Sequence, residues 1–203
     1  CCLLGSELRE RTLAVMGYGS IGREVARLGQ AFGMRVIAFK HRPENRADTH
    51  WRPAGVGDPD GTIPDEFFGP DRMHDFLAQA DYLAISLPHT PATEHIIDEP
   101  ALRAMKRNAY LVNVGRGALI DEAALVRALE EGWIAGAGLD VASREPLPAQ
   151  SPLYGLPNVI LTPHYSALTH RYDDRLTQLF ADNLRRYLAG EELWNEVDVE
   201  RVY

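Results

Sequence analysis

The fold is decided by residues 12–42, which read T-L-A-V-M-G-Y-G-S-I-G-R-E-V-A-R-L-G-Q-A-F-G-M-R-V-I-A-F-K-H-R. The apolar run at 13–16 predicts a buried strand, and a second strand is expected at 36–39. Between them, apolar residues recur at helical spacing, at Ile21, Val25, Leu28 and Phe32. A G-x-G-x-x-G sequence joins the first strand to this helix. In a strand, glycine turn, helix and strand of about thirty residues, that spacing predicts a site for a dinucleotide's pyrophosphate.

Each glycine of the turn has a predicted task. Gly17 permits the tight turn, Gly19 lets the backbone approach the pyrophosphate, and Gly22 lets the helix pack closely on the strand. The unpaired amides and the positive dipole end of the helix then face the phosphates. The cofactor-binding residues expected here are Gly17, Tyr18, Gly19, Ser20, Ile21 and Gly22. The alternative is a tight strand-to-helix turn that binds no ligand.

Length and charge limit the function classes. At 203 residues the chain is one large domain, or one domain with part of another. A net charge of -8 argues against nucleic acid or an anionic membrane as partner. Apolar runs fall short of the roughly 20 residues of a membrane span, and a secretory pattern is absent, so a cytoplasmic location is expected. Cys1 and Cys2 are poor candidates for a disulfide or a metal site, so no metal is expected. A chain that starts with cysteine is expected to begin within a longer protein.

The rest of the chain alternates between predicted strands and helices. Further strands are expected at 82–87, 110–114, 134–139 and 159–161. Helices are expected at 71–79, at 100–106, from Asp121 to before Gly132, and at 168–189, with Asp71 and Asp121 as N-caps. Residues 43–70 are expected to form a surface loop with a turn around Phe67 and Phe68. This alternation predicts an α/β fold, a doubly wound parallel sheet of the Rossmann type with helices on both faces.

In such sheets, ligands bind beyond the carboxyl ends of the strands. Residues that lie where a predicted strand has just ended are therefore candidates, namely Gly17, Lys40, Pro88, Arg116, Asp140 and His164. His164 can donate a proton near neutral pH if a carboxylate orients its ring, and Glu145 and Asp140 are the nearest acids. Arg116 has a guanidinium fork that fits a carboxylate. The alternative for Arg116 is that it caps carbonyl groups near a turn.

Five sequence segments together resemble the D-2-hydroxyacid dehydrogenases, and the resemblance runs from about residue 5 to 203. In order, they are G-Y-G-S-I-G at 17–22, S-L-P-H-T-P-A-T at 86–93, V-N-V-G-R-G at 112–117, G-L-D-V-A-S-R-E-P-L-P at 138–148, and L-P-N-V-I-L-T-P-H at 156–164. The resemblance implies that Arg116 grips the substrate carboxylate and that His164 is the acid/base. It also implies that Glu145 hydrogen-bonds this histidine and that Asp140 lies beside the nicotinamide. Further expected cofactor contacts are Leu87, Pro88, Thr93, Val114, Gly115, Arg116 and His164.

The resemblance implies hydride transfer between a nicotinamide cofactor and a small 2-oxo or 2-hydroxy acid such as glyoxylate or hydroxypyruvate, and a homodimer. Residues 6–167 would form the dinucleotide-binding domain, and residues 168–203 a helix and tail that return to a substrate domain. By this resemblance, the N-terminal part of that substrate domain is expected to be missing, and the fragment is expected to bind cofactor but to turn over slowly. Two alternatives stay open. One is a nucleotide-sensing binding protein, like the corepressors that resemble this family, and the other is a catalytically idle Rossmann domain.

The end of the second strand bears on the choice of cofactor. NAD-selective members of this fold place an acid there to bind the adenosine ribose hydroxyls. This chain instead has Lys40, His41 and Arg42, which would give a ribose 2′-phosphate charge-assisted hydrogen bonds. We therefore predict a preference for NADP(H), with use of NAD(H) left open. The alternative is a solvated basic loop without selectivity.

Overall fold

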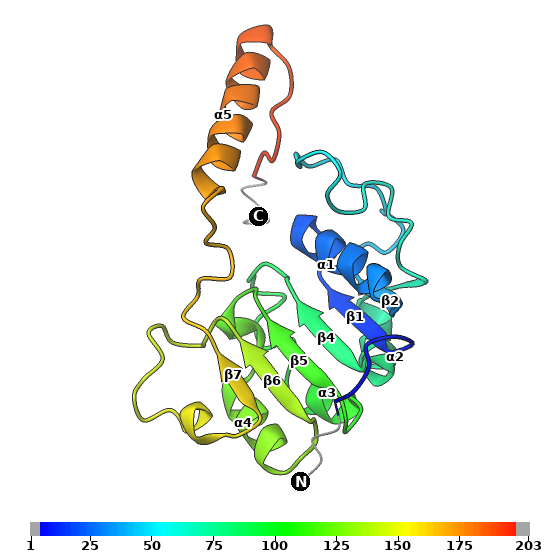
Figure 1. The fold of residues 1–203 in the computed structure, drawn as a ribbon, viewed down its shortest axis with the longest axis vertical. Helices are drawn as coiled ribbons and strands as arrows, with labels where there is room; N and C mark the ends of the chain where they lie inside the picture. The colour runs from blue at the N-terminus through cyan, green and yellow to red at the C-terminus, as the bar shows by residue number, and fades with distance from the viewer. Residues whose placement is uncertain (1–4, 198–203) are drawn as a thin grey trace.

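The computed structural model describes residues 5–197. Its centre is a seven-stranded sheet with the order β3-β2-β1-β4-β5-β6-β7, in which every neighbouring pair is parallel (Figure 1). The strands are β1 (Thr12–Met16), β2 (Arg35–Phe39), β3 (Glu66–Phe68), β4 (Tyr82–Ile85), β5 (Tyr110–Asn113), β6 (Gly136–Leu139) and β7 (Val159–Leu161). The predicted doubly wound parallel sheet is confirmed.

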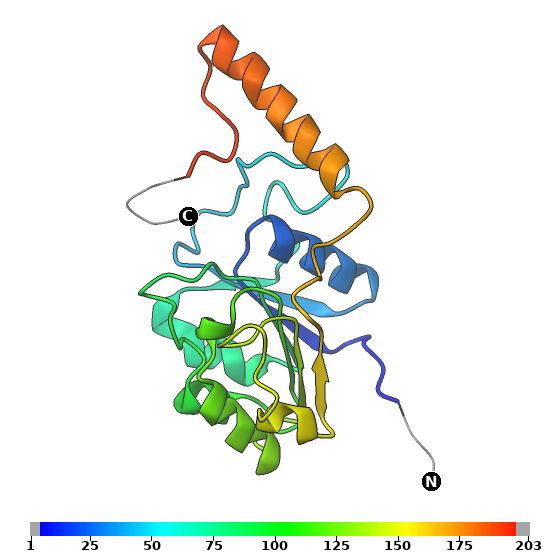
Figure 2. The same cartoon turned by 90° about the vertical axis from the view of Figure 1, so that its left-hand side faces the viewer.

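Helices cover both faces of this sheet. The covering helices are α1 (Ser20–Ala31), α2 (Met73–Gln79), α3 (Glu99–Ala104) and α4 (Glu122–Glu130), and a further helix is α5 (Tyr172–Ala189). Three short 3-10 turns are η1 (Pro70–Arg72), η2 (Gly117–Leu119) and η3 (Pro152–Gly155). In Figure 2, α1 lies on one side of the sheet and α2, α3 and α4 lie on the other. Within the described residues, none of these helices has the length and apolar character needed to cross a membrane.

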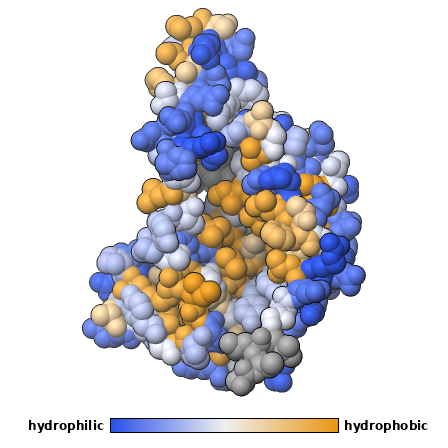
Figure 3. Space-filling view, viewed as in Figure 1, coloured by the Kyte–Doolittle hydropathy of each residue, from blue (hydrophilic) through white to orange (hydrophobic). Residues whose placement is uncertain are grey.

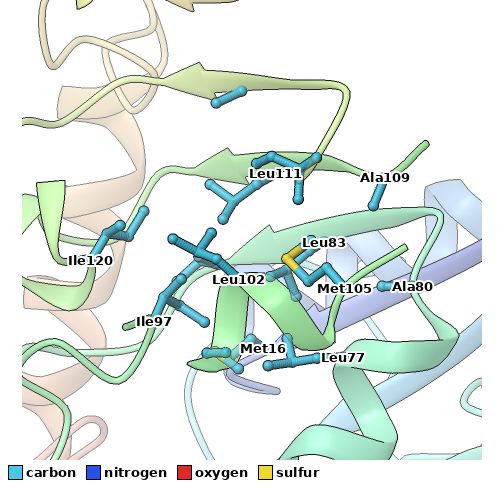
Figure 4. Close-up of a cluster of buried hydrophobic side chains, with 14 of the residues drawn as sticks. Met16, Leu77, Ala80, Leu83, Ile97, Leu102, Met105, Ala109, Leu111 and Ile120 are labelled. Carbon is cyan, nitrogen blue, oxygen red and sulfur yellow. The ribbon is translucent and has the colours of Figure 1, made fainter. Parts of the chain in front are cut away.

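Alternation along the strands produces two cores. Ala14 and Met16 of β1 belong to the larger cluster, under α2, α3 and α4, whereas Leu13 and Val15 belong to the smaller one, under α1. Figure 4 shows Leu83 and Leu111 of the strands meeting Leu102 in the larger cluster. On the α1 side, Tyr110 and Val112 of β5 remain partly exposed. Apolar side chains accordingly gather in the hollow over that part of the sheet (Figure 3).

Two local predictions are wrong. The expected turn at Phe67 and Phe68 is strand β3, which pairs with β2 and buries Phe68 completely. Three residues are too few for a periodic pattern, so the strand could not be distinguished from a turn. The predicted Asp71 cap is also absent, because η1 precedes α2 and Arg72 takes the N-cap position without a side-chain hydrogen bond. By contrast, Asp121 caps α4 as predicted and accepts a hydrogen bond from the Ala124 amide at 3.1 Å.

The apolar spacing that predicts α1 does not mark its buried face. Ile21, Leu28 and Phe32 are 56%, 45% and 58% exposed. Only Val25 of the four predicted residues packs against the smaller core. The other residues close to the sheet are small, and a Cβ atom on Gly29 would lie only 2.4 Å from Leu13 Cδ2. Close approach of α1 to the sheet therefore excludes larger side chains from that face, and they point outward.

Helix α5 starts at Tyr172, four residues later than predicted, and projects away from the sheet (Figures 1 and 2). It ends as predicted at Gly190, which has a left-handed φ of 70°. No residue of α5 is buried. The tail that follows folds back along the helix, and Asn183 exchanges two hydrogen bonds with the backbone of Trp194. Cys1, Cys2 and the last residues of the predicted C-terminal unit, 198–203, lie outside the described residues.

Candidate active site

The glycine turn between β1 and α1 has the shape that its sequence predicts. Gly17 has φ of +98°, and a Cβ atom there would lie 2.9 Å from the Leu87 backbone nitrogen. A Cβ on Gly22 would lie 2.0 Å from the Gly17 carbonyl oxygen. Around Gly19, in contrast, no described atom lies within 4 Å of the Cβ position. Gly17 and Gly22 are thus required by the packing of the turn, whereas Gly19 leaves space that a ligand can enter.

The N-terminus of α1 opens onto this space. Its N-cap, Gly19, supplies no side-chain hydrogen bond, and the first turn contains no acidic residue. The amides of this turn therefore remain available for an anion, and the helix dipole favours negative charge at the same place. The residues present fit a dinucleotide pyrophosphate.

Tyr18, although part of the turn, directs its side chain into the domain. Its ring packs edge-on against Phe67, with centroids 5.4 Å apart, and its hydroxyl donates a hydrogen bond to Asp58 Oδ2 at 2.7 Å. Burial, together with the neighbouring Asp58 carboxylate, raises the pKa of Tyr18. Tyr18 can therefore contact a cofactor only through its backbone atoms.

The basic residues after β2 differ in their surroundings. The Lys40 ammonium donates to the Asn45 carbonyl, and partial burial lowers the pKa of Lys40. His41 and Arg42 are exposed. The Asn45 amide donates to the Arg42 carbonyl at 3.1 Å and closes a turn just beyond the strand. Lys40 thus shapes this turn, and the side chains of His41 and Arg42 lie open to a ligand.

His164 and Glu145 form a pair at the carboxyl edge of the sheet. His164 Nδ1 lies 2.7 Å from Glu145 Oε2, and both side chains are about half exposed. The hydrogen bond from His164 lowers the pKa of Glu145, and the Ala142 amide and the Arg116 charge act in the same direction. Because an ionised carboxylate can only accept, Nδ1 carries the hydrogen, and Nε2 is left for a substrate oxygen.

Asp140 holds the segment that carries His164. Its carboxylate accepts hydrogen bonds from Thr162 Oγ1 at 2.6 Å and from the Tyr165 and Ser166 amides, both at 3.1 Å. Its carbonyl accepts from the His164 amide at 2.8 Å, and His164 has a left-handed φ of 52°. Burial alone would raise the pKa of Asp140, which is 5% exposed, but hydrogen bonding to its carboxylate from Ser166, Thr162 and Tyr165 lowers it to about 2. This structural task was not predicted, because it depends on how the loop after β7 folds.

Arg116 lies on the same edge, after β5. It is exposed, and one of its terminal nitrogens donates to the Gly115 carbonyl at 2.8 Å. The Asn113 side chain fixes the loop by donating to the Arg116 carbonyl at 2.9 Å and accepting from the Gly115 amide at 3.0 Å. Asn113 was missed in the sequence, although its place at the end of a strand was a usable signal.

The loop after β4 joins these parts. Ser86 donates to the Gly17 carbonyl at 2.9 Å, and the Thr93 hydroxyl donates to the Pro88 carbonyl at 2.8 Å. Val114 continues the ladder by donating to the Ile85 carbonyl at 3.1 Å. The predicted site residues therefore gather along the carboxyl ends of the strands. Among residues 5–197, no group of three or more His, Cys, Asp or Glu side chains is placed to hold a metal ion.

Comparison with known proteins identifies the family. The sequence model described as "D-isomer specific 2-hydroxyacid dehydrogenase, NAD binding domain" matches residues 2–166. The chain belongs to this family. Among curated dehydrogenases of similar sequence, the glyoxylate reductase of Aeropyrum pernix is 40% identical over 204 residues, which cover 98% of this chain and 55% of that protein. The glyoxylate reductase of Korarchaeum cryptofilum is 38% identical over 200 residues, which cover 98% of this chain and 56% of that protein.

Solved dehydrogenase structures agree with this assignment. A D-isomer specific 2-hydroxyacid dehydrogenase from Xanthobacter autotrophicus, in complex with NADPH and MES, matches with a TM-score of 0.84 and 31% identity, over 100% of this chain and 77% of that one. An NADPH-dependent glyoxylate/hydroxypyruvate reductase from Sinorhizobium meliloti, in complex with NADP and sulfate, matches with a TM-score of 0.82 and 29% identity, over 100% of this chain and 60% of that one. The chain spans about half the length of the curated relatives it matches.

Proposed function

We propose that the protein transfers a hydride between NAD(P)H and a small 2-oxo or 2-hydroxy acid, with Arg116, Glu145 and His164 as its catalytic groups. The observation that carries the proposal is the 2.7 Å contact between His164 and Glu145, on the same sheet edge as Arg116 and the glycine turn. Family membership and the names of the relatives, glyoxylate reductases among them, support it.

The reaction assigns one task to each group. The bound nicotinamide cofactor supplies the hydride. Arg116 binds the substrate carboxylate, and His164 Nε2 donates a proton to the adjacent carbonyl oxygen. Glu145 orients the imidazole and stabilises its charged form. Because a 2-oxo acid carries its two polar groups on neighbouring carbons, the two contacts fix its position, and fixed geometry is a large part of catalysis.

We further propose that NADP(H) is preferred over NAD(H). The exposed His41 and Arg42 after β2, without an acid at that position, support this choice. The relatives solved with NADPH or NADP agree with it. Values of kcat/KM measured with both cofactors test the preference, and a higher value with NADH would refute it.

The remaining proposals concern the whole protein. Residues 6–167 form the cofactor domain, and residues 168–203 return to a substrate domain. The substrate is glyoxylate, hydroxypyruvate or a similarly small acid, and the protein acts as a homodimer in the cytoplasm. The relatives named as glyoxylate reductases support the substrate class.

Steady-state oxidation of NADPH by the full-length protein, with a panel of 2-oxo acids, tests the function. We expect turnover with small acids and a loss of at least roughly 100-fold in kcat for His164→Asn, with cofactor affinity retained. Tight cofactor binding without turnover of any acid would refute the enzyme and favour a nucleotide-sensing protein.

A further inference from the structure

A buried arginine ties the long loop between β2 and β3 to helix α1. Arg23, in the first turn of α1, is 2% exposed. Its guanidinium donates to the Asp58 carbonyl and, at 2.6 Å, to the Arg46 carbonyl. It thus holds two points of the loop that are twelve positions apart in the sequence.

Other residues of the turn and of α1 support this tie. The Arg23 guanidinium lies 4.8 Å from the centroid of the Tyr18 ring, and the Tyr18 hydroxyl donates to Asp58. The Asp58 carboxylate in turn accepts from the amides of Thr62 and Ile63, both at 3.0 Å. The residues that shape the pyrophosphate turn therefore also fix the path of the loop.

Burial of the Arg23 guanidinium beside Asp48 has an energetic cost. Arg23 Nε and Asp48 Oδ2 are buried without a hydrogen-bond partner among the described residues, and Nε lies 3.8 Å from that oxygen. Incompletely paired buried charges are destabilising, and well-packed apolar side chains would often serve stability better. Stability alone therefore does not account for this arginine.

The contacts of Arg23 show which part of the loop it holds. Arg46 directly follows the turn of residues 42–45, which Lys40 and the Asn45 amide close from the other side. Near Arg23 and Asp48 the loop borders a cavity of about 350 Å³, whose far wall includes Tyr172 and Leu176 of α5. The Arg23 bond to the Arg46 carbonyl, together with the packing of the Arg46 guanidinium 5.1 Å from the centroid of the Phe67 ring, anchors the loop directly after the turn of residues 42–45.

We propose that Arg23 is a positioning residue for cofactor choice, which holds the turn that presents Arg42 to the ribose 2′-phosphate of NADP(H). The inference rests on the proposed function. Arg23 itself is covered by the Tyr18 ring and directed at loop carbonyls, so it acts through the loop and not by contact with the phosphate. Burial is the main cause of the lowered pKa of the Lys40 ammonium, and the nearby positive charge of Arg23 lowers that pKa further.

Cofactor binding by variants of the full-length protein tests this role. Dissociation constants for NADPH and NADH are measured by isothermal titration calorimetry for wild type and for Arg23→Lys, which keeps the charge but lacks the fork needed for two carbonyls. We expect the dissociation constant for NADPH to rise roughly tenfold, and that for NADH to stay within about twofold. The matched control is Arg27→Gln, on the same helix, where the guanidinium pairs with Glu24 at 2.6 Å and makes no bond to the 42–46 turn among the described contacts.

Each outcome is decisive. An unchanged NADPH-to-NADH ratio in Arg23→Lys, with wild type preferring NADPH, would overturn the role of Arg23. If that variant does not fold, Tyr18→Phe removes only the hydroxyl bond to Asp58, and the ratio should shift in the same direction by about threefold; an unchanged ratio there would also overturn it. A wild type that binds both cofactors equally would overturn this inference and leave the dehydrogenase assignment intact. Failure to bind either would remove the proposed function itself.

Discussion

Replacing Asp140 by asparagine should destabilise the protein at neutral pH, and by progressively less as the pH falls from about 4 toward 2. The Asp140 carboxylate accepts three hydrogen bonds, from Thr162 and from the Tyr165 and Ser166 amides. An asparagine keeps one acceptor oxygen but directs an NH₂ group at one of these donors. The substitution therefore removes the ionised acceptor that holds the His164 segment.

The magnitude follows from the pKa of Asp140. A fall from the ordinary 3.8 to about 2 corresponds to about 2 kcal/mol of stability from the ionised carboxylate. Since the pKa is depressed in the folded state, this stability is present above the unfolded value, near pH 4, and is lost as pH falls from about 4 to about 2. Asp140→Asn should therefore lower the free energy of unfolding by about 2 kcal/mol at pH 7, with a difference that narrows below pH 4.

Urea unfolding of wild type and variant at pH 7, 5, 4 and 3 measures this difference. Asp60→Asn, which removes an exposed carboxylate of the loop between β2 and β3, controls for the change in net charge. A loss of the same size at every pH would refute the reasoning, because it would come from shape and not from ionisation. Equal stability at pH 7 would refute it as well.

Two further predictions concern the turn and the catalytic pair. Gly22→Ala places a Cβ atom 2.0 Å from the Gly17 carbonyl and should cost about 1–3 kcal/mol in thermal unfolding, whereas Gly19→Ala, whose Cβ meets open space, should keep stability and weaken NADPH binding. Equal stability of the two variants would contradict the packing argument. Glu145→Gln should lower kcat/KM for reduction of a 2-oxo acid roughly 10- to 100-fold, because His164 loses a charge-assisted hydrogen bond, and NADPH affinity serves as its control. An unchanged rate would exclude Glu145 from catalysis.

The fold was largely predictable because its signals are local. The first strand and the α1 sequence identify one strand-turn-helix unit, and alternation along the rest of the chain predicts the parallel sheet. Strand β3 was missed because three residues carry no period. The buried face of α1 was not evident either, since most residues that pack on the sheet are small, and three of the four apolar residues in the predicted spacing face outward.

The shared location of several candidate site residues was predictable for a different reason. His164, Arg116 and Asp140 each follow a strand, and parallel strands end on one edge, so their position in the sequence was enough to bring them together. The task that the structure gives to Asp140 was not predictable. It depends on hydrogen bonds to Thr162 and Ser166, more than twenty positions away, and their geometry comes from the path of a loop.

Residue types alone did not predict how the three basic residues after β2, Lys40, His41 and Arg42, are arranged. The sequence supplies three potential cations for a 2′-phosphate, but the structure engages the Lys40 ammonium with the Asn45 carbonyl. In the proposed account, selectivity would depend less on the number of cations than on where one turn holds Arg42. Arg46, which directly follows that turn, is bound from α1 by the buried Arg23. Under the role proposed for Arg23, cofactor choice would depend on how this loop is anchored, and substitutions far from the phosphate would change it.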